Sequence, residues 1–168
     1  MSKKEKGLTM NFHDVNESGF VVVQPGRYGG KVSDWKFYHK EDSGNNIYQL
    51  EFTLTSGEYE GEKLRTWQVV NSERRGEVFR LYKNLGLIRD GDRGEDQNLA
   101  VTALFGDTDD AGKIEVTHLV VNGDERPVIG ARATLIVVPD TWDDQPTAKI
   151  KKIEPFSVTP DGDARIPF

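Results

Sequence analysis

Aromatic side chains and cations occur together in three separated stretches of the sequence. A Trp-Lys-Phe run begins at residue 35, a Lys-Leu-Arg-Thr-Trp run begins at residue 63, and a third tryptophan precedes a Lys-Ile-Lys-Lys run. Flat rings stack on unpaired bases whatever their identity, while cations neutralise the phosphates. The residues that we expect to bind nucleic acid are Lys31, Trp35, Lys36, Phe37, Lys63, Arg65, Trp67, Trp142, Lys149 and Lys151.

Most of these rings also have a purely structural explanation. Large aromatic side chains fill the core of half-buried sheets, and for Trp35, Phe37 or Trp67 taken singly this is the commoner outcome. Trp142 differs, because it stands between Thr141 and Asp143 in a polar stretch where burial would gain little. A binding role therefore requires that the tryptophans share one exposed surface.

Three consecutive strands are expected between residues 26 and 71 to position these side chains. Each run is rich in aromatic and β-branched residues and ends at a Gly, Asn, Asp or Ser cluster. The middle run, 47–54, alternates between an apolar face and a more polar face, as in an antiparallel sheet with one buried side. Simple alternation places Trp35 and Phe37 on one side with Lys31, and Trp67 with Lys63 and Arg65.

One helix and further strands are expected after these three. Residues 72–85 carry apolar side chains at helical spacing, and Gly86 stops the helix. Residues 97–130 then form a β-rich insertion, with an Asn-Gly turn at Asn122. Two closing strands follow at 131–138 and 147–156, joined by the loop that carries Trp142.

This order of elements predicts a mainly β fold. Three strands, a helix, an insertion and two strands follow the order of the OB fold, a five-stranded barrel that binds ligands on strands 2 and 3 and the loops beside them. We expect a flexible N-terminal arm at 1–18, an OB-fold domain at 19–156 with the insertion at about 97–130, and a short C-terminal interaction tail at 157–168.

The charge distribution is compatible with a basic groove. The net charge is −6, but residues 89–128 contain four cations and ten acids and so account for all of it. Cysteine is absent, which favours a reducing compartment, and no apolar run approaches the roughly 20 residues of a membrane span. We therefore expect a cytoplasmic protein without a membrane partner, and the oligomeric state, including a homo-oligomer, stays open.

Enzyme and metal motifs are weak. The acidic run that starts at Asp107 begins like a calcium loop, but Ala111 and His118 occupy positions where that loop requires ligands. The three histidines have no metal-ligand spacing, and no phosphate loop or nucleophile motif occurs. We expect no catalytic residues, no metal and no cofactor. Among enzymes, a metal-dependent nuclease is the one alternative that carboxylates on a β-barrel would allow, although no particular pair of them stands out.

The C-terminus carries a further motif. The chain ends in Ile-Pro-Phe after two aspartates, and in this it resembles bacterial single-stranded DNA-binding proteins, whose acidic tails close with the same tripeptide. The runs PGRYGGKV, YQLEFTLTSGEYEGEKL and AKIKKIEP are similar to the phage-encoded members of that class. The resemblance implies that the tip recruits replication or recombination proteins through Asp161, Asp163, Ile166, Pro167 and Phe168.

The sequence thus predicts sequence-tolerant binding of single-stranded DNA in phage replication, recombination or repair, inside the bacterial host. The alternative is an OB-type protein-interaction or virion-assembly module that does not bind DNA. In that case the aromatic rings would lie in the core and the insertion would be the docking surface.

Overall fold

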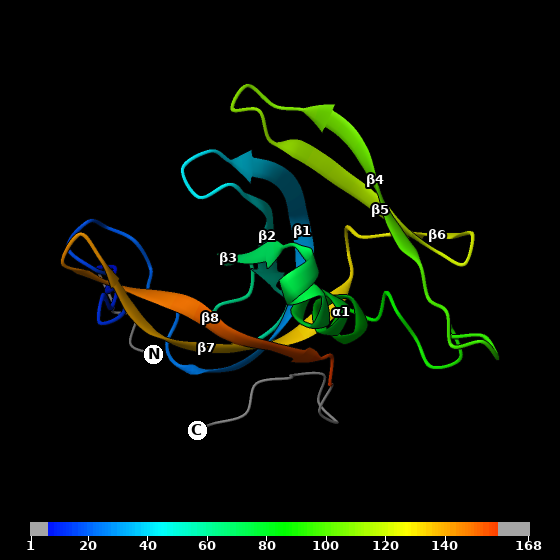
Figure 1. Ribbon diagram of the computed structural model, residues 1–168. Coiled ribbons are helices and arrows are strands. Elements are labelled where there is room, and N and C mark those ends of the chain that lie inside the picture. Colours follow the sequence, from blue (N-terminus) through cyan, green and yellow to red (C-terminus); the bar gives the residue numbers. More distant parts are fainter. Residues whose placement is uncertain (1–6, 158–168) are drawn as a thin grey trace.

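The computed structural model describes residues 7–157, which form a mainly β, antiparallel structure with one short α-helix (Figure 1). The elements are β1 (Gly26–Lys40), β2 (Asn45–Leu54), β3 (Lys63–Val70), a 3-10 turn (Ser72–Arg74), α1 (Arg75–Asn84), β4 (Val101–Thr108), β5 (Ile114–Val121), β6 (Asp124–Pro127), β7 (Arg132–Trp142) and β8 (Gln145–Pro155). The prediction of a β-rich chain is confirmed. Among the described residues, no helix is long and apolar enough to cross a membrane.

Strand β1 organises the sheet because it pairs with three other strands. Residues 26–31 pair with β7, residues 36–37 pair with β5, and β2 runs along the opposite edge. Two strands cannot occupy the same edge of β1 at the same residues, so β1 leaves β7 before it meets β5. Figure 1 accordingly shows the β7–β8 and β4–β5 hairpins extending from β1 in different directions.

A β-bulge at Ser33 divides β1. The β2 residues opposite Val32 and Asp34 are direct neighbours, so Ser33 is an extra residue without a partner on β2. An extra residue shifts the in-and-out alternation of a strand by one position. Lys31, before the bulge, is exposed, whereas Trp35, after it, is fully buried.

The core lies between the inner faces of the strands and α1. It contains Val32 and Trp35 from β1, Leu50 and Phe52 from β2, and Leu135 from β7, all with 2% or less of their surface exposed. On this inner face of β2 every second residue from Tyr48 to Leu54 is buried, as the alternation predicts. The other face is less exposed than expected, because Ile47 and Gln49 are buried as well.

Helix α1 forms where the sequence predicts it. The Asn71 side chain caps the preceding 3-10 turn by accepting a hydrogen bond from the Arg74 N–H at 2.9 Å, and Gly86 takes a left-handed backbone conformation, with φ of 73°, just after the helix. Val78, Leu81 and Tyr82 form the buried face. The Asn84 side chain then donates to the Ile153 carbonyl at 2.8 Å, which fixes the helix end to β8.

The strand pairing leaves an opening between β3 and β8. The ladders join β3 to β2, β2 to β1, β1 to β7 and β7 to β8, and no ladder joins β3 to β8 within residues 7–157. Helix α1 contacts both of these strands. The sheet is thus open in its hydrogen bonding, and the helix lies at the opening.

Strands β4, β5 and β6 form the segment between α1 and β7. They pair in sequence order, and β5 attaches the whole segment to β1. The loop before β4 is fastened to β6 by the buried Arg126, which pairs with both carboxylate oxygens of Asp92 at 2.8 and 3.0 Å. Hydrogen bonds from Arg126 and from the Arg89 N–H lower the pKa of Asp92 to about 2.

Candidate nucleic-acid interface

The outer face of β1, β2 and β3 carries aromatic and basic side chains in rows across the strands. Cross-strand partners share one face of a sheet. Trp67 on β3 lies opposite Gln49 on β2, which lies opposite Lys36 on β1. In the same way, Lys63 lies opposite Thr53 and Thr53 lies opposite Lys31. Arg65 stands between Lys63 and Trp67 on β3. These rows bring together five of the predicted residues: Lys31, Lys36, Lys63, Arg65 and Trp67.

Trp67 is the exposed ring of this face, with 55% of its surface accessible. Its indole N–H donates to the Gln49 Oε1 atom at 3.2 Å, so the ring has a fixed attachment while its surface remains open. Lys113, from the tip of the β4–β5 hairpin, donates to the same oxygen at 2.9 Å and lies 4.8 Å from the centre of the Tyr38 ring. A cation, a tyrosine and a tryptophan therefore meet around one amide.

The basic residues on β3 are only partly neutralised. Glu51 accepts from Arg65 at 3.4 Å and lies 3.8 Å from Lys63, and the Ser33 hydroxyl donates to the same carboxylate. Glu51 has only 15% of its side chain exposed, against 60% for Lys63 and 57% for Arg65. The two cations therefore reach solvent beyond the acid and remain accessible to a phosphate.

A cleft of about 350 Å³ continues this surface past Trp67, between β3, α1 and β8. Arg80 from α1 and Lys151 and Lys152 from β8 line it together with Trp67. Lys151 is the extra residue of a bulge in β8, which explains why two successive lysines reach one cleft. The lining residues of the cleft do not include Lys149, although it is exposed.

The prediction that Trp35 stacks on bases is wrong. Its exposed fraction is 0%, and its ring packs edge-on against Tyr48 at 5.2 Å between centroids. Phe37 is also on the inner side, half-buried and stacked on Phe105 at 5.2 Å. The bulge at Ser33 is the cause, since it places Trp35 and Phe37 on the side opposite to Lys31.

Lys36 lies on the outer face but is largely covered, with 19% of its side chain exposed. Asp109, from the β4–β5 hairpin tip, lies 3.9 Å from its ammonium group. Hydrogen bonds from the backbone N–H groups of Lys113 and Ala111, with the charges of Lys36 and Lys113, hold the pKa of Asp109 below its usual value. The hairpin tip therefore covers part of the predicted surface with a carboxylate.

Trp142 lies apart from the Trp67 surface. It is 74% exposed at the tip of the β7–β8 hairpin, where Asp143 and Asp144 form the turn with φ of 55° and 61°. The N-terminal segment holds this tip, because the Asn16 side chain donates to the Pro146 carbonyl at 2.9 Å. Within the described part of the chain, no ring contact connects Trp142 to Trp67.

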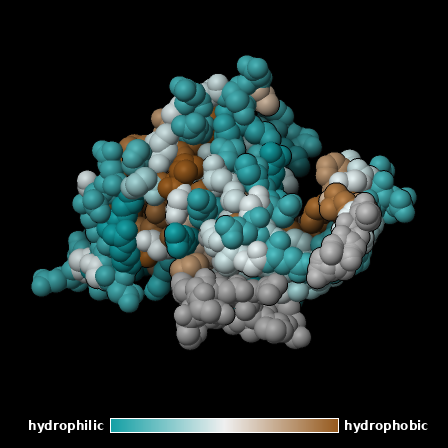
Figure 2. All heavy atoms as spheres, turned by 180° about the vertical axis from the view of Figure 1, so that it is seen from behind, coloured by the Kyte–Doolittle hydropathy of each residue, from teal (hydrophilic) through white to brown (hydrophobic). Residues whose placement is uncertain are grey.

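Exposed apolar side chains also gather beside this hairpin. Leu8, Met10, Phe12 and Phe20 are each more than 60% exposed on the N-terminal segment. Figure 2 shows brown apolar surface at its right-hand edge, on the side of the molecule where this segment and the β7–β8 hairpin lie. This end of the molecule therefore presents apolar and acidic groups rather than cations.

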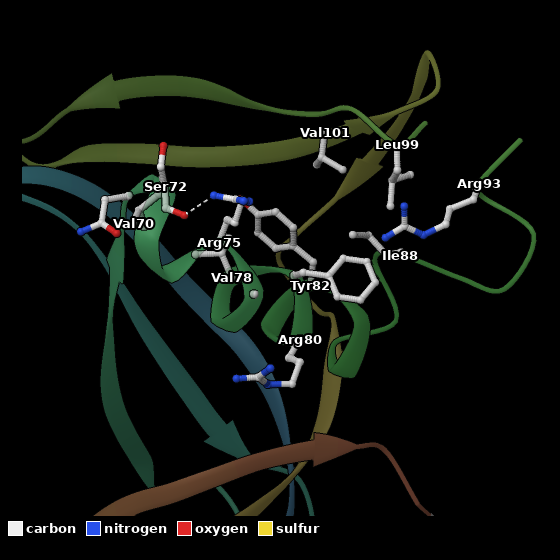
Figure 3. A pocket seen from close by; sticks show the side chains of 13 residues that line it. Val70, Ser72, Arg75, Val78, Arg80, Tyr82, Ile88, Arg93, Leu99 and Val101 are labelled. Atoms are coloured by element: carbon white, nitrogen blue, oxygen red, sulfur yellow. Dashed lines mark hydrogen bonds between the residues drawn. The ribbon is translucent and has the colours of Figure 1, made fainter. Parts of the chain in front are cut away.

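A larger groove of about 770 Å³ lies on the other side of α1, against the start of β4 (Figure 3). Its floor is apolar and includes Ile88, Leu99 and Val101. Arg75 and Arg93 reach it from opposite ends, and Arg75 donates to the Ser72 carbonyl at 2.7 Å.

Arg80 lines both this groove and the cleft beside Trp67. In Figure 3 its side chain points from α1 toward β8, away from the apolar floor. Arg80 is thus shared by the two hollows, and the sequence prediction omitted it although basic residues are dense at 74–83.

Other members of the surface had a weaker signal in the sequence. Gln49 lies on the polar face of the strand expected at 47–54, and Lys152 directly follows a predicted residue. Lys113 is 64 residues from Gln49 in the sequence, and no local sequence pattern predicts their contact. The predicted tip residues lie outside the described part of the chain; they are Asp161, Asp163, Ile166, Pro167 and Phe168.

A comparison of the sequence with models of known protein families finds no match, and a comparison with curated proteins finds none either. The function is therefore inferred from the residues and their geometry.

Proposed function

We propose that this chain is a non-catalytic protein that binds single-stranded DNA with little sequence preference. It would serve phage DNA replication, recombination or repair in the cytoplasm of a bacterial host. The observation that carries the proposal is the position of Trp67, an exposed ring with Lys63 and Arg65 on one side and the Arg80, Lys151 and Lys152 cleft on the other.

The surface matches what a single strand requires. One base stacks on the Trp67 ring, and a stacked base contributes about 1–3 kcal/mol of binding free energy. The neighbouring phosphates lie against the cations of β3 and of the cleft, and their neutralisation releases counterions. Trp142 would add a second stacking ring only for a strand long enough to reach the hairpin.

The proposed architecture is an OB-type barrel built from β1, β2, β3, β7 and β8. The pairing of β3 with β2, β2 with β1, β1 with β7 and β7 with β8 supports it. The Cα atoms of β3 and β8, which approach within 8 Å of each other, support it as well. Contacts of α1 with both strands support it further, because the helix would close the gap that the ladders leave. The binding face would then be the outer face of β2 and β3.

The C-terminal tip would recruit replication or recombination proteins, as its resemblance implies. The terminal Phe168 would supply an apolar anchor, and Asp161 and Asp163 would steer the approach to a basic surface. This part of the proposal rests on the sequence.

Tryptophan fluorescence tests the proposal, because the buried Trp35 is shielded and only Trp67 and Trp142 are exposed. Oligo(dT) is added to the Trp142→Phe and Trp67→Phe variants. We expect quenching in Trp142→Phe that sodium chloride reverses, and little quenching in Trp67→Phe. Absence of quenching in the wild-type protein, with cooperative thermal unfolding intact, would exclude the proposed site.

The groove of Figure 3 favours a second candidate, a protein-interaction or virion-assembly module. Its apolar floor and its arginines fit an acidic peptide with one large apolar side chain. The alternative places the docking surface on the insertion, and Leu99 and Val101 at the start of the insertion line this groove. In this case Leu99→Asp abolishes binding of such a peptide and leaves oligo(dT) binding unchanged.

A further inference from the structure

Among residues 7–157, one cluster of potential metal-ligating side chains lies outside the surfaces described above. His13, Asp14 and Glu58 each offer one ligand atom, and these atoms all lie within 4.8 Å of one another. His13 and Asp14 belong to the N-terminal segment, while Glu58 belongs to the turn between β2 and β3. We propose that these three side chains bind one divalent transition-metal ion of the Zn²⁺ class.

The donor set suits such an ion. One imidazole nitrogen and two carboxylate oxygens are ligands that Zn²⁺ and similar ions accept, and three protein ligands leave a coordination position for water. Because the ligands come from segments far apart in the sequence, no metal-binding spacing is visible in the chain. The sequence by itself therefore predicts no metal site at the histidines.

The side chains around the cluster orient its ligands. The Asn11 Oδ1 atom lies 3.1 Å from His13 Nδ1 and also accepts from the His13 backbone N–H at 3.0 Å. A carbonyl oxygen at Nδ1 places the ring proton there and leaves the Nε2 lone pair for a metal. The buried Tyr59 hydroxyl donates to Asp14 Oδ2 at 2.9 Å, so that Oδ1 remains available.

The local charge also favours a cation. Among residues 7–157, neither Asp14 nor Glu58 forms an ion pair with a lysine or arginine. The turn at 56–62 adds Glu60 and Glu62 and contains no basic residue. A dication would therefore neutralise carboxylates that no lysine or arginine of residues 7–157 pairs with.

The metal would fasten the N-terminal segment to the β2–β3 turn. The same segment holds the β7–β8 hairpin through Asn16 and through the Glu17 N–H, which donates to the Gln145 side chain at 3.1 Å. Binding would thus order the end of the molecule that carries Trp142. This is a structural role that does not depend on DNA binding.

Isothermal titration of the full-length, chelator-treated protein with ZnCl2 tests the site. We expect one ion per chain, and a loss of affinity of more than about 10-fold in His13→Gln and in Glu58→Gln. Both residues are exposed, so the fold is retained, which circular dichroism checks. Tyr59→Phe, which removes only the orienting hydroxyl, should lower affinity by about 10- to 100-fold.

His39→Gln is the matched control, because His39 lies 3.8 Å from Glu41 in an exposed pair that has no third ligand among the described residues. It should leave the Zn²⁺ affinity unchanged. Equal affinity in the wild type, His13→Gln and Glu58→Gln overturns the proposal, as does an equal loss in His39→Gln. A nuclear magnetic resonance spectrum that shows the Zn²⁺-induced shift on His39 or His118 rather than on His13 overturns it as well.

Discussion

Trp67 and Lys113 donate hydrogen bonds to the same atom, Oε1 of Gln49, at 3.2 and 2.9 Å. The tryptophan is on β3 and the lysine is next to β5, which pairs with β1. The amide thus connects the exposed ring to the tip of the β4–β5 hairpin. A movement of the hairpin tip would therefore change the hydrogen bonding of Gln49, and with it the position of the Trp67 ring on which we expect a base to stack.

The shared amide predicts the effect of Gln49→Met, a change of similar volume that removes the acceptor. Each of the two hydrogen bonds contributes about 0.5–1.5 kcal/mol, and their loss lets the Trp67 ring turn. We expect oligo(dT) affinity to fall by about 2- to 13-fold, the equivalent of one such bond, and the melting temperature to fall by a few degrees because both bonds are lost. Fluorescence titration in the Trp142→Phe background measures it. An unchanged affinity would show that the ring needs no attachment.

Salt dependence reports which cations contact phosphates. For single strands the slope of log affinity against log salt falls by about 0.7 for each contact that is removed. Lys63→Gln and Lys151→Gln should each reduce the slope by about that amount. Lys149→Gln is the matched control, since Lys149 is also exposed on β8 but does not line the cleft. Equal slopes in all three variants contradict the proposed path of the strand.

Close packing at Gly30 predicts a stability effect. A Cβ atom at this position would lie 2.6 Å from the Leu135 Cδ1 atom, and Leu135 is fully buried. Gly30→Ala should therefore cost about 1–3 kcal/mol of unfolding free energy in urea denaturation. In a Leu135→Ala background the clash disappears, so the same substitution should cost much less. Additive costs would mean that the two side chains do not meet.

The Asp92–Arg126 pair predicts a response to acid. Hydrogen bonds from Arg126 and Arg89 lower the pKa of Asp92 to about 2 in the folded protein, from an ordinary value of 3.8. Because the pKa of Asp92 is lower in the folded than in the unfolded protein, the pair contributes its full stabilisation at pH values above the pKa of the unfolded state. This contribution is lost as the pH falls from about 4 toward about 2.

Melting temperatures of wild type and Asp92→Asn across this range test the acid response. The wild-type advantage should be largest above about pH 4 and shrink toward about pH 2. Asp90→Asn is the control, because Asp90 is fully exposed and meets Lys83 only at 3.9 Å. A difference that is independent of pH would show that Asp92 does not titrate in this window.

Much of the local structure was predictable from the sequence because its causes are local. Turn residues bound β1, β2 and β3, apolar spacing marks α1, and Gly86 ends it. Alternation within β3 correctly placed Trp67 on one face with Lys63 and Arg65, since no bulge interrupts that strand. The sequence by itself therefore determined the strands and helix that carry the candidate surface.

The tertiary structure alone decided which side chains share that surface. One extra residue, Ser33, reverses the alternation of β1, and so Trp35 and Phe37 turn inward while Lys31 stays outside. Lys113 reaches Gln49 only because β5 pairs with β1, and the register of strands distant in the sequence has no local signature. Side chains alternate with a period of two residues, so a single-residue shift moves every later side chain to the other face.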